Sequence, residues 1–363
     1  MSGVFVLMGS GETSPTMVEL HKSLARGTAR VTVLDTPYGF QENADELSAR
    51  ALAYFRESVG VEAQVVSLRT ADAPAHETGA ALAALAEADY VFAGPGSPTY
   101  ALRQFRALGV ADVLGGVLER GGVVCLASAA SVTAGELSIP VYEIYKVGQA
   151  PYWERGADLL GRIGLRATVV PHFNNTEGGT HDTSCCYVGR RRLTALRTEA
   201  PDLPVLGIDE HTAAVIDPST GHVQVHGAGQ VHVLAGDDEH HHAAGSSFDL
   251  AGALLGGPLT PQPEEQVRRS DLAEAVRDKD ARGVVRALAE AAEADPSTAA
   301  VIAALAEPLD RGWTEPDVGL LLEARTQARA DKQWQLSDLL RDGLAALGVV
   351  VEDTADGQRV RRT

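Results

Sequence analysis

A serine, a histidine and a glutamate in this chain each follow a hydrophobic run, and together these side chains could carry out acyl transfer. Ser128 ends Val-Val-Cys-Leu-Ala-Ser, His172 lies in Val-Val-Pro-His-Phe, and Glu210 ends Gly-Ile-Asp-Glu. A serine hydroxyl becomes a good nucleophile only when a base takes its proton, and a carboxylate can orient that base. Because the runs predict buried parallel strands, we expect the three groups to meet at the strand ends of a sheet.

The residues around Ser128 are unusually small, as the segment 121–135 shows. Small neighbours are what a sharp strand-to-helix turn needs in order to project a nucleophile into a site. The alternative is a buried serine that caps the first amides of a helix. The matching positions of His172 and Glu210 favour the nucleophile.

The segments that would position these groups alternate between strand-like and helix-like patterns as far as about residue 255. The expected order is strand 4–8, helix 17–24, strand 29–34, helix 42–59, strand 63–67, helix 79–88 and strand 90–93. This order predicts an α/β fold with a doubly wound, mostly parallel sheet. After Glu210 the pattern changes, and we expect a hairpin over 213–216 and 223–226 with a further strand at 230–234.

The composition divides the chain into two domains. Residues 256–263 combine glycines and prolines, which break helices and strands and predict a linker. We therefore expect one domain over 1–255 and a second over 264–363. The second is rich in Ala, Leu, Glu, Asp and Arg at helical spacing, with no strand expected before 349–351.

Four short motifs in order resemble the cyanophycinase and dipeptidase E family of serine peptidases. They are Gly94-Pro-Gly-Ser97, Ala127-Ser-Ala129, Pro171-His-Phe173 and Gly207-Ile-Asp-Glu210. The family has a fold similar to that of class I glutamine amidotransferases, with serine in place of cysteine. The resemblance covers residues 1 to 255 and implies the same fold here.

The resemblance assigns roles to individual residues. It implies Ser128 as nucleophile, His172 as general base and Glu210 as the group that orients the histidine, with Glu143 as a rival acid. It implies an oxyanion hole made by backbone amides near Gly96 and at Ala129. The ordinary interpretation of Glu143 is a salt bridge to Lys146, which we prefer.

One residue departs from the family pattern, because Ala130 stands where the family has a glycine two positions after the serine. An alanine narrows the room for a strained turn and puts activity in doubt.

The substrate-binding candidates are Ser97, Asn174, Arg190, Arg191 and Arg192. Residues 174–192 predict a loop over the site, because glycines and short polar side chains dominate them. Related peptidases carry arginines after the catalytic histidine, and any of the three here could pair with a carboxylate. Each arginine could equally lie at a solvated helix start.

The end of the chain carries a second resemblance, since residues 322–353 and 357–362 look like the helical tail of cysteinyl-tRNA synthetases. A tRNA contact would use Arg325, Arg329, Lys332 and Arg341 as phosphate ligands. Residues 264–363 hold 14 basic and 20 acidic side chains, which favours a packing or dimerisation module over RNA binding.

Composition excludes several other classes of function. The net charge of −18 argues against a broad nucleic-acid or membrane surface, and no apolar run approaches the length of a membrane span. The first residues predict a strand rather than a signal peptide, and the three cysteines fit a reduced cytoplasmic protein. We interpret the run 240–242, three histidines, as a solvated loop, because three consecutive side chains cannot face one metal.

The sequence therefore predicts a serine hydrolase that cleaves a peptide, isopeptide or related amide bond of a small charged substrate. Such a reaction needs no metal and no organic cofactor. Two alternatives stay open: a catalytically silent binding protein, and a tRNA-associated accessory protein acting through its tail. A homo-oligomer is compatible with all three.

Overall fold

The computed structural model describes residues 3–254, 322, 325, 326, 329, 337, 340, 341, 344, 349–354 and 357–362. The chain divides into two compact units, Met1–Thr260 and Pro261–Thr363, and each is considered by itself. The expected linker at 256–263 lies outside the described residues.

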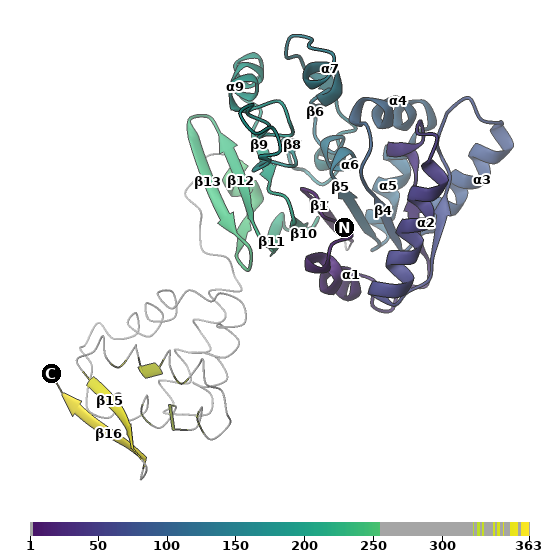
Figure 1. The fold of residues 1–363 in the computed structure, drawn as a ribbon. Coiled ribbons are helices and arrows are strands. Elements are labelled where there is room, and N and C mark those ends of the chain that lie inside the picture. Colours follow the sequence, from purple (N-terminus) through teal and green to yellow (C-terminus); the bar gives the residue numbers. More distant parts are fainter. Residues whose placement is uncertain are drawn as a thin grey trace. The chain divides into compact units, whose positions relative to one another are not determined.

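The first unit is built on an eight-stranded sheet in the order β14-β11-β10-β1-β5-β4-β2-β3 (Figure 1). Its parallel half consists of β1 (Val4–Met8), β2 (Val31–Leu34), β3 (Ala63–Val66), β4 (Tyr90–Ala93) and β5 (Val123–Ala127). This mixed α/β architecture confirms the fold class expected from the sequence.

Hydrophobic cores cover both faces of the parallel half, which is why its strands are continuous apolar runs. In β1, Phe5 and Leu7 enter one core while Val6 and Met8 enter the other. The first core includes side chains of α3 (Ala75–Ala86), α4 (Pro98–Leu108) and α5 (Val110–Glu119). The second includes side chains of α1 (Val18–Leu24) and of a π-helical turn, η3 (Phe55–Val59), that extends α2 (Ala44–Tyr54).

The expected hairpin forms β10 (Thr212–Ile216) and β11 (His222–Gly227), and this prediction is confirmed. β10 pairs antiparallel with β1, and β14 (Ser247–Asp249) pairs with β11, so this half of the sheet is antiparallel.

A second sheet has four strands in the order β13-β12-β9-β8. β8 (Thr168–Val170) and β9 (Val205–Ile208) are parallel, whereas β12 (Gln230–Ala235) and β13 (Asp238–Ala243) form a hairpin. The histidine run 240–242 therefore lies in strand β13, and the expectation of a solvated loop was wrong. Hydrogen bonding to β12 holds this segment in extended conformation, and its side chains therefore alternate between the two faces of the sheet.

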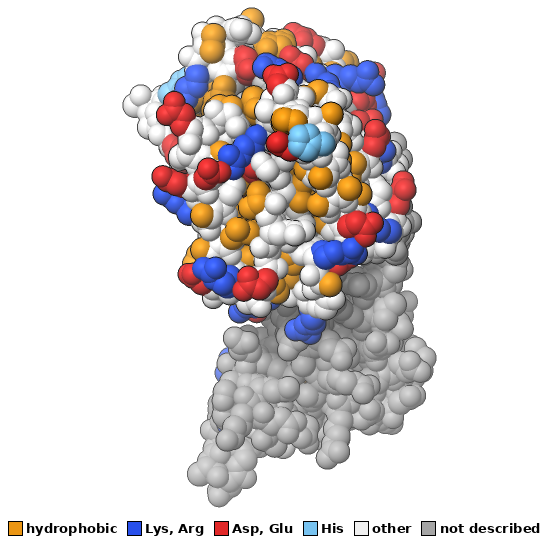
Figure 2. Space-filling view, turned by 90° about the vertical axis from the view of Figure 1, so that its right-hand side faces the viewer, with side chains coloured by type: hydrophobic (Ala, Val, Ile, Leu, Met, Phe, Trp, Pro, Cys, Tyr) orange, Lys and Arg blue, Asp and Glu red, His pale blue; other side chains and the backbone are white. Residues whose placement is uncertain are grey.

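The remaining elements of the first unit are short. They are η1 (Pro15–Met17), η2 (Thr36–Tyr38), α6 (Ala129–Val132), β6 (Leu137–Ser138), α7 (Val141–Tyr145), β7 (Glu154–Arg155), α8 (Leu159–Arg162), α9 (Arg190–Glu199) and α10 (Leu250–Leu254). Acidic and basic side chains are interspersed on the face of the molecule that Figure 2 shows.

In the second unit, every described position from 322 to 344 is helical. A hairpin of β15 (Val349–Thr354) and β16 (Gly357–Arg362) follows. Among the described residues, no helix has the length and apolarity that crossing a membrane requires.

Candidate active site

Ser128 stands at the turn between β5 and α6 in a strained backbone conformation. Its φ of 51° and ψ of −119° belong to a region that L-residues rarely adopt. Ala129 and Ala130 follow it in α6 and are both buried, so no large side chain crowds the turn. This is the sharp strand-to-helix turn that the small residues predict.

Ala130 fits the turn that the family pattern reserves for glycine. It is a helical residue of α6 without a positive φ, and its amide donates to the Gly94 carbonyl at 3.3 Å. Because the position needs no left-handed backbone, alanine is not strained there. The backbone at Ala130 therefore shows no strain that would make alanine incompatible with the turn.

His172 follows β8 and contacts the Ser128 hydroxyl. Its Nε2 lies 2.8 Å from Ser128 Oγ, and its own φ of 48° is also left-handed. The imidazole is largely enclosed, with 13% of the side chain exposed. A base at this distance can accept the hydroxyl proton directly.

Glu210 follows β9 and holds the other side of the imidazole. Its Oε1 lies 2.8 Å from His172 Nδ1, and the same oxygen accepts a hydrogen bond from Asn175 Nδ2 at 2.9 Å. Burial raises the pKa of Glu210, but hydrogen bonds from His172 and Asn175 and the nearby histidines outweigh it, so the pKa lies below its usual value. An ionised Glu210 fixes the tautomer in which Nδ1 donates and Nε2 accepts.

The rival acid Glu143 is not hydrogen-bonded to His172. Its Oε2 accepts a hydrogen bond from Thr99 at 3.0 Å, while His172 Nδ1 is bonded to Glu210. The expected salt bridge from Glu143 to Lys146 is absent among the described residues, and the Lys146 ammonium lies 4.5 Å from the centre of the Tyr145 ring.

Two backbone amides expected to form an oxyanion hole lie on neighbouring segments. The hydrogen bond from Ala130 to Gly94 ties the loop that contains Gly96 to the start of α6, where Ala129 lies. In the described part of the chain, neither the Gly96 amide nor the Ala129 amide donates to a protein acceptor. Unpaired amides beside a nucleophile can bind a developing oxyanion.

The loop over the site contains an uncommon left-handed turn. Cys185, Cys186 and Tyr187 are consecutive and have φ values of 54°, 61° and 67°. Among the described residues, seven that are not glycine have a positive φ. Besides these three, they include Ser128, His172 and His211. Such strain gathers at functional sites, where the surrounding structure maintains it. The Tyr187 ring contacts the His172 ring, with ring centres 5.3 Å apart.

The candidate substrate-binding residues have partners within the protein. Ser97 caps α4 by accepting from the Tyr100 amide, and Asn174 accepts from the Glu210 amide at 2.8 Å. Arg190 forms an ion pair with Glu239 at 3.1 Å, and Arg192 donates to the Val188 carbonyl at 3.0 Å.

Arg191 is the third arginine of this group, and it is exposed at the start of α9. Ser97 thus caps α4, Asn174 holds the backbone of Glu210, and Arg190 is already paired with a carboxylate.

Three residues near Ser128, His172 and Glu210 were not identified as site residues from the sequence. Asn175 is 1% exposed and orients Glu210, although it stands beside the candidate Asn174. Tyr187 lies in a polar loop, and its large aromatic side chain was the only sequence signal that could have identified it. Glu12 is buried, and burial raises its pKa against the effect of His172 and His211. The polar segment 9–15 after β1 was the available signal for Glu12.

The cysteines do not compete as nucleophiles. All three are buried, and burial raises the pKa of Cys125 to about 12 and of Cys185 to about 11. Burial also raises the pKa of Cys186. Thiols in this state are not ionised near neutral pH and are poor nucleophiles.

Comparison with solved structures confirms the expected fold. A peptidase from an acI-B1 Actinobacterium superposes with a TM-score of 0.55 at 25% identity, covering 69% of this chain and 97% of that chain. A candidate peptidase E protein from Listeria monocytogenes gives a TM-score of 0.42 at 16% identity, covering 66% and 98%. The likeness to the actinobacterial peptidase shows that the first unit shares the fold of that protein.

Comparison of sequences confirms the second resemblance. Residues 315–361 match the family model for the cysteinyl-tRNA ligase anticodon binding domain. The chain is 69% identical over 36 residues to the cysteine–tRNA ligase of Micrococcus luteus, covering 10% of this chain and 7% of that enzyme. It is 54% identical over 44 residues to that of Thermus thermophilus, covering 12% and 9%. The chain thus spans less than a tenth of the length of these two ligases.

Proposed function

We propose that the first unit is a serine hydrolase that cleaves a peptide, isopeptide or related amide bond through Ser128, His172 and Glu210. The observation that carries this proposal is the unbroken hydrogen-bond chain from Ser128 Oγ to His172 and on to Glu210, with both links 2.8 Å long. The strained backbone of Ser128 supports it, because a serine that only caps a helix does not need that conformation.

The chemistry follows from the tautomer that Glu210 selects. Nε2 of His172 takes the hydroxyl proton as Ser128 Oγ attacks the carbonyl carbon, and the imidazolium then protonates the leaving nitrogen. Water, activated by the same nitrogen, then attacks the acyl-enzyme, releases the acid and restores Ser128. The amides of Gly96 and Ala129 hold the carbonyl oxygen as it becomes negative.

The substrate would be small and charged, as the resemblance implies. An anionic substrate that used Arg190 would have to share its guanidinium with Glu239, because the two are already paired. Arg191 is exposed and is the alternative cation in this loop.

Labelling with a fluorophosphonate tests the proposal. We expect a single adduct on Ser128, detected by mass spectrometry of peptides, that is lost in Ser128→Ala and in His172→Ala. Folding of each variant is checked by circular dichroism. A folded protein that forms no adduct would support the alternative, a silent binding protein that uses the same pocket.

The match at residues 315–361 favours a second candidate function, contact with tRNA. Of the arginines considered, Arg325 is fully buried and unsuited to a phosphate, whereas Arg329 and Arg341 are partly exposed. Lys332 lies outside the described residues. The excess of acidic side chains in 264–363 opposes such binding.

Binding of tRNA to the full chain at about 50 mM and 200 mM salt tests this second function, because phosphate contacts weaken steeply with salt. Affinity that falls with salt and in Arg329→Ala would support it. If no tRNA binds, the tail is a packing or dimerisation module. Sedimentation of the same sample would then show whether the chain forms a dimer.

A further inference from the structure

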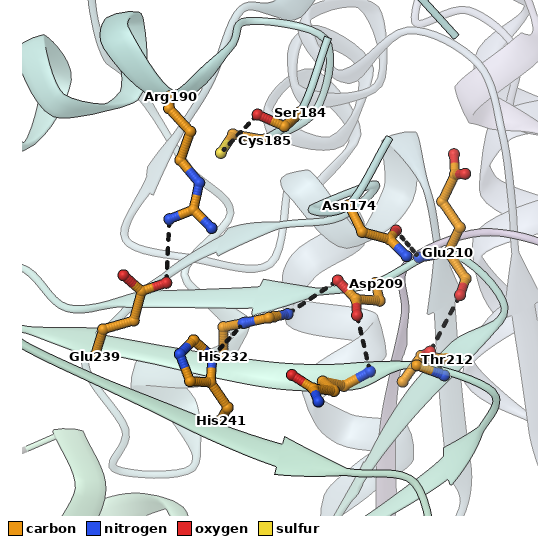
Figure 3. A network of polar contacts seen from close by, with 12 residues as sticks. Asn174, Ser184, Cys185, Arg190, Asp209, Glu210, Thr212, His232, Glu239 and His241 are labelled. Carbon is orange, nitrogen blue, oxygen red and sulfur yellow. Dashed lines mark hydrogen bonds and ion pairs between the residues drawn. The ribbon is translucent and has the colours of Figure 1, made fainter. Parts of the chain in front are cut away.

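Two histidines and a carboxylate converge on one face of the β12–β13 hairpin, and none of them belongs to the proposed triad. His232 of β12 is paired directly with His241 of β13, and Glu239 precedes His241 by two residues on the same face. The two Nδ1 atoms lie 2.7 Å apart. One ligand atom from each of the three residues lies within 4.8 Å of the others. Figure 3 shows His232 bonded to His241, with Glu239 beside them and its carboxylate bonded to Arg190.

Strand alternation decides which histidines of the run take part. His241 points toward His232, while His242 points to the opposite face, where it is buried and stacks on Phe248 with ring centres 3.6 Å apart. The three consecutive histidines therefore cannot bind one ion together. The additional ligands come from the paired strand and from position i−2, which the run by itself does not reveal.

His232 is held as a metal ligand would be held. Its Nε2 donates to Asp209 Oδ1 at 2.9 Å, which leaves the lone pair on Nδ1, and its ring stacks on Phe173. Asp209 is itself fixed, because its second oxygen accepts from the Gln230 amide at 2.9 Å. A carboxylate behind an imidazole is the usual outer support of a histidine ligand.

The geometry requires little movement to admit an ion. Two nitrogens bound tetrahedrally to zinc at their usual distance are about 3.4 Å apart, so the rings would separate by less than about 1 Å. His241 is exposed and can move, while His232 stays in place. Arg190 occupies Oε1 of Glu239, which leaves Oε2 for the ion.

We propose that His232 Nδ1, His241 Nδ1 and Glu239 form a site for a divalent first-row transition-metal ion, with zinc as its probe. Imidazole and carboxylate donors suit this class, and three protein ligands leave a fourth position for water. The site does not depend on the proposed hydrolysis. The competing interpretation is a simple hydrogen bond between the two imidazoles. In that case Glu239 would not contribute to metal binding.

The test is calorimetric titration of the chelator-treated full chain with zinc. We expect one saturable ion per chain, with affinity at least tenfold weaker in His241→Ala and in Glu239→Gln. Both side chains are exposed, so these variants should fold. His240→Ala is the matched control, because it removes a neighbouring histidine of the same strand from the other face, and its affinity should be unchanged.

Cobalt provides a second readout, since the tetrahedral ion absorbs strongly in the visible range. We expect that absorption in the wild type and in His240→Ala, and its loss in His241→Ala. No saturable binding at one equivalent, or an equal loss in His240→Ala, would overturn the site and leave the contact between His232 and His241 as a hydrogen bond.

Discussion

Asp209 and Glu210 are adjacent in the chain, and each binds a different histidine. Asp209 Oδ1 lies 2.9 Å from His232 Nε2, whereas Glu210 Oε1 lies 2.8 Å from His172 Nδ1. The end of β9 thus orients the proposed base of the triad through one residue and the proposed metal ligand through its neighbour. The two sites share this short segment of backbone, and Figure 3 shows Asp209 and Glu210 on it, with Asp209 bonded to His232.

Replacing Glu210 by Gln should lower kcat by about 10⁴, because a neutral amide no longer selects the reactive tautomer of His172. The turnover of an amide substrate identified by screening would be compared with that of the wild type. Glu143→Gln is the matched control. It should change kcat by less than threefold, since Glu143 is bonded to Thr99 and not to the imidazole. A large loss in Glu143→Gln would reverse the assignment.

Asn175→Ala should lower kcat by about ten- to hundredfold, because a buried hydrogen bond to a charged group is lost. Asn175→Asp should do more than slow the reaction. A second carboxylate beside Glu210 would raise the pKa of that pair and move the acid limb of the kcat/KM profile to higher pH. A purely structural role for Asn175 would leave the position of this limb unchanged.

Ser128→Gly should be more stable than Ser128→Ala by about 1–3 kcal/mol, since both lack the hydroxyl but only glycine relieves the left-handed backbone. Chemical denaturation of the two variants measures this difference. Equal stabilities would show that the turn is not strained, and would weaken the case for a nucleophile held under tension.

Gly96→Ala should abolish labelling by the fluorophosphonate. A Cβ at this position would lie 1.9 Å from the Pro37 carbonyl oxygen, and the φ of 148° is unfavourable for alanine, so the loop must shift. Gly79→Ala in α3 serves as the control, because a Cβ there meets nothing within 4 Å. That variant should be labelled normally, and its free energy of unfolding should rise by about 0.5–1 kcal/mol. Normal labelling of Gly96→Ala would remove Gly96 from the oxyanion hole.

Stability should fall as the pH drops from 6.5 to 4, because burial lowers the pKa of His21 to about 4. Its Nε2 donates to the Glu12 carbonyl at 2.8 Å, and Nδ1 accepts from the Tyr90 hydroxyl at 2.6 Å, which requires the neutral ring. The unfolded chain binds this proton near its ordinary pKa, while the folded chain resists it. The loss is complete below the folded pKa and reaches about 3 kcal/mol.

Denaturation curves at pH 6.5, 5.5 and 4.5 would measure this dependence, and His21→Gln should make it shallower. The same change at His76, whose side chain is 83% exposed, should leave the slope as in the wild type. Identical slopes in both variants would exclude His21 as the group responsible.

The elements with strong local patterns were predictable from the sequence. Continuous apolar runs mark β1 and β5 because both faces of these strands are buried, and the small residues around Ser128 anticipate its turn. Three strand ends placed Ser128, His172 and Glu210 at one location, and the structure brings these residues together. This part of the site follows from local sequence and the order of elements.

The remaining features have weak local signals or depend on contacts between segments distant in sequence. β13 was not expected because its acidic and histidine residues form no apolar run, so the pairing of His232 with His241 across the β12–β13 hairpin was missed. The left-handed turn at 185–187 contains no glycine that would announce it. The choice between Glu210 and Glu143 depends on which carboxylate the His172 ring meets in space.

The proposed triad bridges two sheets, since Ser128 follows β5 of the eight-stranded sheet and His172 follows β8 of the four-stranded one. A nucleophile and a base on separate sheets are inert until those sheets have docked. During synthesis, Ser128 emerges 44 residues before its base, so the nascent chain holds no working hydrolase. The proposed reactivity of Ser128 therefore requires that both sheets have formed and docked.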